Sequence, residues 1–411
     1  MSKIIINEGY SKNPELFKSA KGSIISYKNK NYIDLSMCAG SILLGHNHEI
    51  VKKVINKFLK EKVSNVAAPN IHAENFAKNI KRIVPNSEKI IFCNSGTEGV
   101  IKSLRISRAI NNKLKIAYVT GGWHGSVDQL LFKTGKSLKP IELSGGLLDS
   151  HKKNLVLIPY NEIEKTKKIL ERYKKKLNCI IVEPVQASLP YENIKNYLSY
   201  LEVFCKKNNC NLIFDEMITG LRTDCSSVQK YFKIKPDISI FGKCFGAGFP
   251  IGIITINKKV SKKLIKVKPK VFFGGTFSGN SIITFIGNEV LKYVTKNRKK
   301  IFYKLNMNAK YFEEELNKFF TKSKLDLKVY RFKSMLRLVY SKKFMLDRAS
   351  RDFFETRKNK KISKFKKYIQ SQNINMPANG IMFISLAHEK SQINYLVKKF
   401  KIGAIKFFKK F

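Results

Sequence analysis

Two short stretches carry residue types suited to chemistry on a small anionic molecule. In "CNSGTEG" (93–99), Ser95-Gly96-Thr97 joins a strand-like run to a helical pattern, so its backbone N–H groups can hold an anion at a helix N-terminus. In "LIFDEMITGLR" (212–222), Asp215 ends an apolar run and has no adjacent basic residue. A buried carboxylate needs a cation or strong donors. The stretch alone leaves open whether Asp215 meets such a partner or caps the next turn.

A third stretch, "SIFGKCFGAGFPIG" (239–252), contains a lysine in apolar surroundings. Burial disfavours the charged form of an amine, which makes Lys243 a usable nucleophile. An exposed surface lysine is the default interpretation, because 68 of the 411 residues are lysine. Lys243, however, follows a predicted buried strand and precedes a glycine-rich turn, and this position favours a chemical role.

Together these residues match the parts of one cofactor. The Ser95-Gly96-Thr97 turn suits a phosphate monoester, Asp215 suits a protonated ring nitrogen, and Lys243 suits an imine. Trp123, the only tryptophan, lies in "GGWHG" after another predicted strand and could stack on a flat ring. A pyridine aldehyde phosphate needs this set of partners. The sequence therefore predicts a site for pyridoxal 5′-phosphate (PLP).

The elements expected to position these residues alternate between strands and helices from about residue 70 to 260. The predicted strands are near-continuous apolar runs, and they are "KIIFCN", "KIAYVT", "NLVLIPY", "CIIVEP", "NLIFDE", "ISIFGK" and "IGIITIN". Runs of this kind belong to a mostly parallel sheet with helices on both faces. Ligands bind at the carboxyl ends of such strands, so the site is expected there. Residues 22–36 are expected to form a hairpin that turns on Lys28-Asn29-Lys30.

The charge is strongly basic, with 79 basic against 30 acidic residues and a net charge of +49. Such an excess is typical of proteins that bind nucleic acid or anionic membranes. Here the lysines are spread along the whole chain, and no basic arm or arginine-rich tract occurs. We interpret the excess as a solvated surface and expect neither a nucleic-acid nor a membrane partner. A basic nucleic-acid-binding or scaffold protein on the same fold is the remote alternative.

The seven cysteines indicate a reducing environment. They are odd in number and never spaced CxxC, so free thiols are expected in place of disulfides or a zinc site. His46 and His48 in "GHNH" are interpreted as turn residues, and no metal is expected. No apolar stretch suits a signal peptide or a spanning helix, so the expected location is the cytoplasm.

The chain resembles class III PLP-dependent aminotransferases of fold type I, in the glutamate-1-semialdehyde aminomutase-like branch. The resemblance rests on motifs in family order over nearly the whole chain. They are "ILLGHNHEIV" (42–51), "NSGTEG" (94–99), "GGWHGSVDQLL" (121–131), "IIVEPV" (180–185), "LIFDEMITGLR" (212–222), "PDISIFGKCFGAGFPIG" (236–252), "GGTFSGN" (274–280) and "ISLAH" (384–388). It implies an α/β fold with an arm and hairpin (1–50), a large PLP-binding domain (51–290) and a small α+β domain (291–411).

The resemblance also implies roles for individual residues. Lys243 would form the aldimine and move the proton between substrate and cofactor, through a pyridoxamine intermediate, and Asp215 would pair with the ring nitrogen. The implied cofactor-binding set is Ser95, Gly96, Thr97, Trp123, His124, Glu183, Asp215, Met217, Lys243 and Thr276. Met217 would pack on the ring face opposite Trp123. Thr276 would reach the phosphate of the neighbouring subunit's cofactor, which implies a homodimer. For His124, packing in the core is an equally open interpretation.

The implied reaction is amino-group transfer between a small-molecule amine donor and a carbonyl acceptor. The alternative is an intramolecular aminomutase that acts on glutamate-1-semialdehyde. Departures from the aminomutase pattern favour transfer between a separate donor and acceptor. Trp123 replaces the usual Tyr or Phe, no arginine precedes Arg82, and Gly380 stands near the position of a glutamate. The gating loop, 132–154, is only partly like its counterpart. Arg222 and Arg337 are the nearest candidates for a residue that binds the substrate carboxylate.

Overall fold

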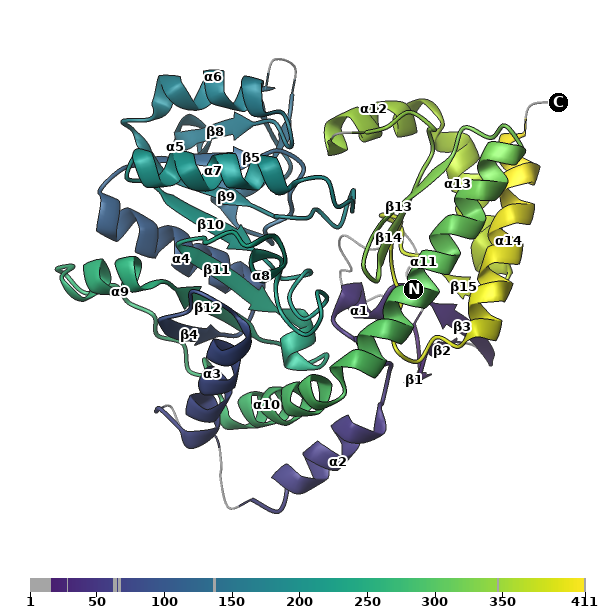
Figure 1. Cartoon of the computed structure of the whole chain (residues 1–411), viewed down its shortest axis with the longest axis horizontal. Coiled ribbons are helices and arrows are strands. Elements are labelled where there is room, and N and C mark those ends of the chain that lie inside the picture. Colours follow the sequence, from purple (N-terminus) through teal and green to yellow (C-terminus); the bar gives the residue numbers. More distant parts are fainter. Residues whose placement is uncertain are drawn as a thin grey trace. The chain divides into compact units, whose positions relative to one another are not determined.

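The computed structural model describes residues 16–27, 29–61, 65, 68–135, 138–345 and 347–409. The chain divides into two compact units. Unit 1 is formed by the described parts of 1–53, 187–191 and 299–411, and unit 2 by those of 54–186 and 192–298. Figure 1 shows the elements of each unit along the chain.

Unit 2 is built on a seven-stranded sheet whose strands follow the order β4-β12-β11-β10-β9-β5-β8. The strands are β4 (Lys89–Cys93), β5 (Lys115–Val119), β8 (Leu155–Ile158), β9 (Leu177–Val182), β10 (Asn211–Asp215), β11 (Ile238–Gly242) and β12 (Gly252–Ile256). These are the seven predicted strands, which confirms the prediction of a mostly parallel sheet. The exception is β12, which runs antiparallel to both β11 and β4. A two-stranded ribbon of β6 (Phe132–Thr134) and β7 (Pro140–Glu142) lies apart from the sheet.

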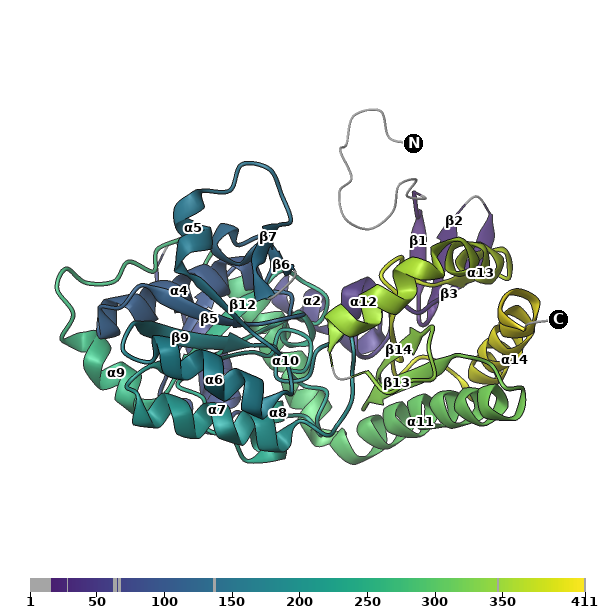
Figure 2. The same cartoon turned by 90° about the horizontal axis from the view of Figure 1, so that it is seen from above.

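Helices cover both faces of this sheet, as continuous apolar strands require. Figure 2 shows α4 on one side of the sheet, and α6 and α7 on the other. The helices of unit 2 are α3 (Ile71–Ile83), α4 (Gly96–Asn111), α5 (Asp149–Asn154), α6 (Ile163–Tyr173), α7 (Lys195–Lys207), α8 (Val228–Phe232), α9 (Lys258–Ile265) and α10 (Ser281–Lys296), with short 3₁₀ turns at η1 (Asp128–Leu130) and η3 (Lys243–Gly246). Apolar side chains of α4 and of the strands form one buried core between them.

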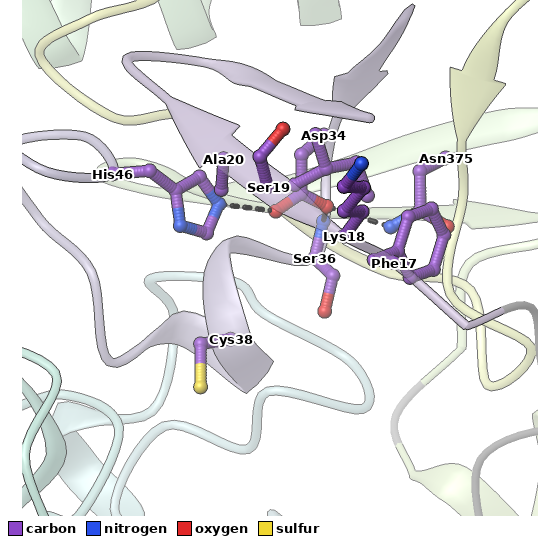
Figure 3. A pocket seen from close by; sticks show the side chains of 10 residues that line it. Phe17, Lys18, Ser19, Ala20, Asp34, Ser36, Cys38, His46 and Asn375 are labelled. Atoms are coloured by element: carbon purple, nitrogen blue, oxygen red, sulfur yellow. Dashed lines mark hydrogen bonds and ion pairs between the residues drawn. The ribbon is translucent and has the colours of Figure 1, made fainter. Parts of the chain in front are cut away.

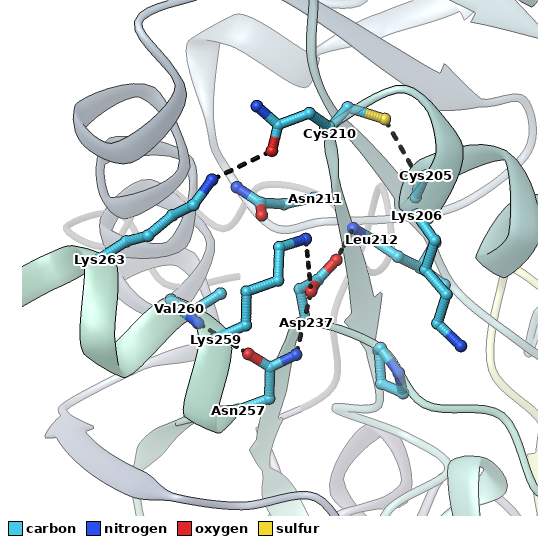
Figure 4. Close-up of polar contacts among 12 residues, drawn as sticks. Cys205, Lys206, Cys210, Asn211, Leu212, Asp237, Asn257, Lys259, Val260 and Lys263 are labelled. Carbon is cyan, nitrogen blue, oxygen red and sulfur yellow. Dashed lines mark hydrogen bonds and ion pairs between the residues drawn. The ribbon is translucent and has the colours of Figure 1, made fainter.

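One edge of the sheet is fixed by a buried carboxylate. Asp237, just before β11, accepts hydrogen bonds from the Leu212 backbone N–H (3.0 Å) and from Asn257 Nδ2 (3.0 Å), with Lys259 Nζ 3.4 Å away (Figure 4). These contacts join the amino ends of β10 and β11 to the carboxyl end of β12. The carboxyl ends of the parallel strands therefore meet together at the opposite edge.

Unit 1 contains two small sheets and their helices. One sheet is β1 (Ser19–Lys21), β2 (Ile24–Tyr27), β3 (Lys30–Asp34) and β15 (Ile374–Asn375), and the other is β13 (Lys328–Phe332), β14 (Met335–Val339) and β16 (Ile381–Phe383). The helices are α1 (Met37–Gly40), α11 (Arg298–Lys322), α12 (Arg348–Arg357), α13 (Asn359–Ser371) and α14 (Lys390–Phe408). The helix α2 (Glu49–Phe58) begins in unit 1 and ends in unit 2. The expected hairpin is the antiparallel pair β2–β3, and the Lys28 of its turn lies outside the described residues.

Candidate active site

Five loops of unit 2 leave the strands at the same edge of the sheet and carry the predicted site residues. Ser95 follows β4, Trp123 follows β5, Glu183 follows β9, Asp215 ends β10 and Lys243 follows β11. The register of the parallel strands sets Asp215 opposite Ile240, two residues before β11 ends. The sheet thus brings side chains that are far apart in the sequence to one edge, as predicted.

Asp215 is the buried carboxylate of this edge, with 3 % of its surface exposed. Its Oδ2 lies 2.7 Å from His124 Nδ1, and its Oδ1 accepts a hydrogen bond from the Met217 backbone N–H at 3.1 Å. The ring of His124 packs edge-on against Tyr118, and its buried Nε2 has no hydrogen-bond partner among the described residues. His124 therefore holds and orients Asp215. The sequence had left open whether His124 contacts the cofactor or packs in the core, and a role in orienting Asp215 was not predicted.

Lys243 lies at the junction between β11 and the glycine-rich turn. Burial lowers the pKa of its ammonium below the usual value, against the opposing charges of Asp215 and Glu183. Its backbone adopts φ 45°, a left-handed conformation that is uncommon for a residue with a side chain. A lowered pKa favours the neutral amine relative to an exposed lysine, and a neutral Nζ can accept and return a proton.

The N-terminus of α4 forms the anion-binding part of the edge. Ser95 is the N-cap residue, because its Oγ accepts the Glu98 backbone N–H at 3.2 Å. The first N–H groups of a helix have no partner within the helix, so Gly96 and Thr97 can donate to an anion. Gly125, with φ 72°, packs against Thr97, and a Cβ there would overlap Thr97 Oγ1. Gly125 is not among the predicted residues; its place in "GGWHG" is the only sequence signal for it.

The remaining predicted residues occupy distinct positions. Met217 packs against both Gly96 and Gly242, where an added Cβ would clash with its side chain. Glu183 is buried, and its Oε2 accepts the Trp123 backbone N–H at 3.3 Å. The Trp123 side chain is 55 % exposed.

Three further residues complete the comparison with the prediction. Thr276 lies in an exposed segment with Phe272 and Phe277. Arg222, a candidate for binding a substrate carboxylate, is 1 % exposed, and its Nε donates to the Ile218 carbonyl at 3.0 Å. Arg337, the other candidate, belongs to unit 1.

The two histidines of "GHNH" have local partners in unit 1. His46 Nε2 lies 2.8 Å from Asp34 Oδ2, and Figure 3 shows the ring pointing at that carboxylate. Asn375 Nδ2 donates to the other oxygen of Asp34 at 2.7 Å. This network borders a cavity of about 470 Å³. His48 Nδ1 accepts the Ile50 backbone N–H at 3.2 Å. Both side chains thus serve local structure, in line with their interpretation as turn residues.

The donors and acceptors at this edge fit PLP. The buried Asp215 has an imidazole and one N–H as partners and can take a protonated ring nitrogen. The α4 N-terminus offers N–H donors for a phosphate, and Lys243 offers an amine with a lowered pKa. Three chemically different groups at one sheet edge match the three polar ends of the same cofactor.

The class of protein follows from this fold and site together with comparisons to known proteins. Residues 5–331 match the family model "Aminotransferase class-III", and the chain belongs to this family of PLP-dependent enzymes. It is 32 % identical to the glutamate-1-semialdehyde 2,1-aminomutase of Thermosipho africanus over 400 residues, 94 % of this chain and 91 % of that one. The same enzyme of Thermodesulfovibrio yellowstonii is 31 % identical over 97 % of this chain and 92 % of its own.

Solved structures agree on the fold. An omega-transaminase from Sphaerobacter thermophilus superposes with a TM-score of 0.87 at 21 % identity, over 96 % of this chain and 92 % of that chain. A glutamate-1-semialdehyde aminomutase from Pseudomonas aeruginosa, in complex with PMP, gives a TM-score of 0.87 at 15 % identity. The match covers 97 % of this chain and 89 % of that chain. The fold is therefore that of the fold type I PLP enzymes, as the resemblance implied. No described helix is long and apolar enough to cross a membrane.

We predict that His124→Phe weakens PLP binding by about tenfold or more, because a hydrogen bond to a charged group contributes about 1.5–3 kcal/mol. Phenylalanine keeps the ring that packs on Tyr118 but leaves Asp215 without its imidazole partner. Titrating the apo-protein with PLP measures the change. His124→Asn, which retains a donor, should recover part of the affinity. Equal affinity in wild type and His124→Phe would show that His124 only packs.

Proposed function

We propose that this chain moves an amino group on PLP bound at the carboxyl edge of the unit 2 sheet, and that the reaction is an intramolecular 2,1-aminomutation. The observation that carries the chemistry is the convergence of the buried Asp215, Lys243 and the α4 N-terminus on one edge. The intramolecular form is supported by the names of the curated relatives, which align over more than nine-tenths of this chain.

Each residue has a defined task in this proposal. Gly96 and Thr97 hold the phosphate through backbone N–H groups, and Asp215, oriented by His124, holds the protonated ring nitrogen. Bound PLP supplies the electron sink that weakens the C–H bond beside the amino group. Lys243 Nζ accepts the proton from that carbon and returns it at a second carbon. Glu183 and Met217 line the same edge and belong to the proposed cofactor-binding set, as do Ser95 and Trp123.

A second candidate is transfer between separate donor and acceptor molecules, and Gly380 favours it. In the aminomutase branch that this chain resembles, a glutamate stands near this position. Here Gly380 has φ 73°, and a Cβ would overlap Arg337 Nη1, so no larger side chain fits without moving the arginine.

The two candidates differ in whether a second molecule is needed. The PLP-loaded protein should convert glutamate-1-semialdehyde (4-amino-5-oxopentanoate) to its isomer 5-amino-4-oxopentanoate with no other amine or carbonyl compound present. Product analysis by mass spectrometry after derivatisation measures this. No isomer, together with amine transfer from an added donor to an added carbonyl acceptor, would establish the second candidate. If the protein retains PLP but shows neither isomerisation nor amine transfer, both candidate functions are contradicted.

We further propose a homodimer in which Thr276 of one copy reaches the cofactor phosphate of the other. The segment that carries it is exposed, with Phe272 at 74 % and Phe277 at 62 %, and exposed aromatic side chains of this size suit a protein interface. A cytoplasmic location is supported by the seven cysteines, all of which are free.

A further inference from the structure

A buried arginine of unit 1 has two donors without a partner among the described residues. Arg337, in the middle of β14, is 2 % exposed. Its Nη2 donates to Glu355 Oε2 at 2.8 Å, but Nε and Nη1 are buried and have no hydrogen-bond partner among the described residues. Leaving donors of a charged group unsatisfied in the interior is costly, so such donors indicate a place for an acceptor.

A second buried arginine lies beside the first. Arg351 of α12 is 5 % exposed; its Nη1 donates to the Ser188 carbonyl and its Nη2 to Asp352 Oδ1 at 2.5 Å. Its Nε is 3.8 Å from Glu355 Oε2, the oxygen that Arg337 also uses. One carboxylate is therefore shared between two guanidinium groups.

A third cation completes the cluster. Lys366 of α13 is partly buried, and its Nζ donates to the Ala378 carbonyl at 2.5 Å. Burial and then the positive charges of Arg337 and Arg351 lower its pKa to about 8, with Glu355 opposing. The lysine is thus close enough to both arginines to be repelled by them.

The charges of this cluster do not balance. Arg337, Arg351 and Lys366 face one enclosed carboxylate, Glu355, while the side chain of Asp352 is about half exposed. Two arginines cannot lose their protons to relieve the excess, and uncompensated buried charge is strongly unfavourable. Tyr340, whose buried hydroxyl also has no partner among the described residues, adds a neutral donor in this part of unit 1.

We propose that Arg337, Arg351 and Lys366 form a binding site in unit 1 for the oxyanion of a small molecule, a carboxylate or a phosphate group. Arginine pairs with both groups through two parallel hydrogen bonds, and Nε and Nη1 of Arg337 are donors without a partner among the described residues. The inference goes beyond the proposed function, because it rests on unit 1 alone and on none of the residues assigned to PLP.

The test uses the PLP-loaded protein, so that the anion site at the α4 N-terminus is already filled. We expect inorganic phosphate and succinate to raise the melting temperature in a saturable way at ionic strength held constant with sodium chloride. Lys366→Met should weaken phosphate affinity by about tenfold or more, as expected for the loss of one charge-assisted hydrogen bond.

The matched control is Lys367→Met, which removes the same charge from an exposed position on the same helix. This control is needed because a protein of net charge +49 attracts anions everywhere on its surface. Phosphate affinity should be unchanged in it. Stabilisation by phosphate and succinate that is no greater than that by sodium chloride would overturn the proposal. An equal loss of phosphate affinity in Lys366→Met and Lys367→Met would also overturn the proposal.

Kinetics then separate the two sources of the anion. If the oxyanion belongs to the substrate, Lys366→Met raises KM for glutamate-1-semialdehyde but not for its analogue 2-aminobutanal, which lacks the carboxylate. If it belongs to a separate small molecule, phosphate affinity falls in the variant while both KM values stay unchanged. Because the melting assay needs no turnover, failure of this site and failure of the proposed function remain distinguishable.

Discussion

Lys243→Ala should abolish amino-group transfer, lowering kcat by at least about 10⁴-fold, the upper end of what one positioned acid–base group contributes. The physical reason is that the variant lacks the only amine assigned to carry a proton between the two carbons. The fold should survive, because alanine places the same Cβ on this left-handed backbone (φ 45°) and the Lys243 side chain makes no hydrogen bond with the described residues.

Steady-state turnover and PLP affinity, measured together, check this prediction. PLP should still bind noncovalently through Asp215 and the α4 N-terminus, and added methylamine should restore part of the activity. Lys258→Ala, an exposed lysine at the start of α9, is the matched control and should behave as wild type. Substantial turnover by Lys243→Ala without added amine would show that another group moves the proton.

Asp215→Asn should lower kcat by about 10²–10³-fold, the usual cost of removing one preorganised electrostatic partner at a reacting centre. The amide can still contact His124, but it no longer carries the charge that keeps a ring nitrogen protonated. The electron sink is therefore weakened while the geometry is kept. Turnover of an established substrate measures the effect.

The control for this variant is Asp237→Asn, which removes a carboxylate of comparable burial at the opposite edge of the same sheet. We expect that variant to lose stability, because it weakens the contacts of Leu212 and Asn257, but to keep kcat. If Asp215→Asn and Asp237→Asn changed kcat equally, Asp215 would have only a structural role.

Most of the large sheet was predictable because its strands are uninterrupted apolar runs between turn signals. Parallel strands end at a common edge, so the meeting of Asp215 and Lys243 followed from the strand assignment. The antiparallel direction of β12 was not predictable from its own residues, since a strand buried on both faces reads the same in either direction.

The side-chain partners of the site were harder to predict. The bond between His124 and Asp215 joins residues 91 positions apart and depends on how two loops turn after leaving β5 and β10. Ser95 was predicted among the cofactor-binding residues, and the structure shows its hydroxyl occupied as the N-cap of α4. A serine three residues before an acidic residue at a helix start is a capping signal that the sequence does contain.

The cluster around Arg337 illustrates a further limit of sequence reasoning. Its cations come from β14, α12 and α13, and only the fold of unit 1 brings them together. No motif marks such a set, because each residue alone looks like one of many basic residues in a lysine-rich chain. Residues 187–191 likewise join unit 1 without any sequence feature that indicates it.

The central claim is that Lys243 is the amine that engages PLP at the unit 2 sheet edge. The direct test is borohydride reduction of the PLP-loaded protein, followed by proteolysis and mass spectrometry of the peptides. We predict a pyridoxyl group fixed on Lys243 Nζ, absent from the Lys243→Ala variant treated in the same way. A label on another lysine, or a wild-type protein that takes up no label after incubation with PLP, would contradict the claim.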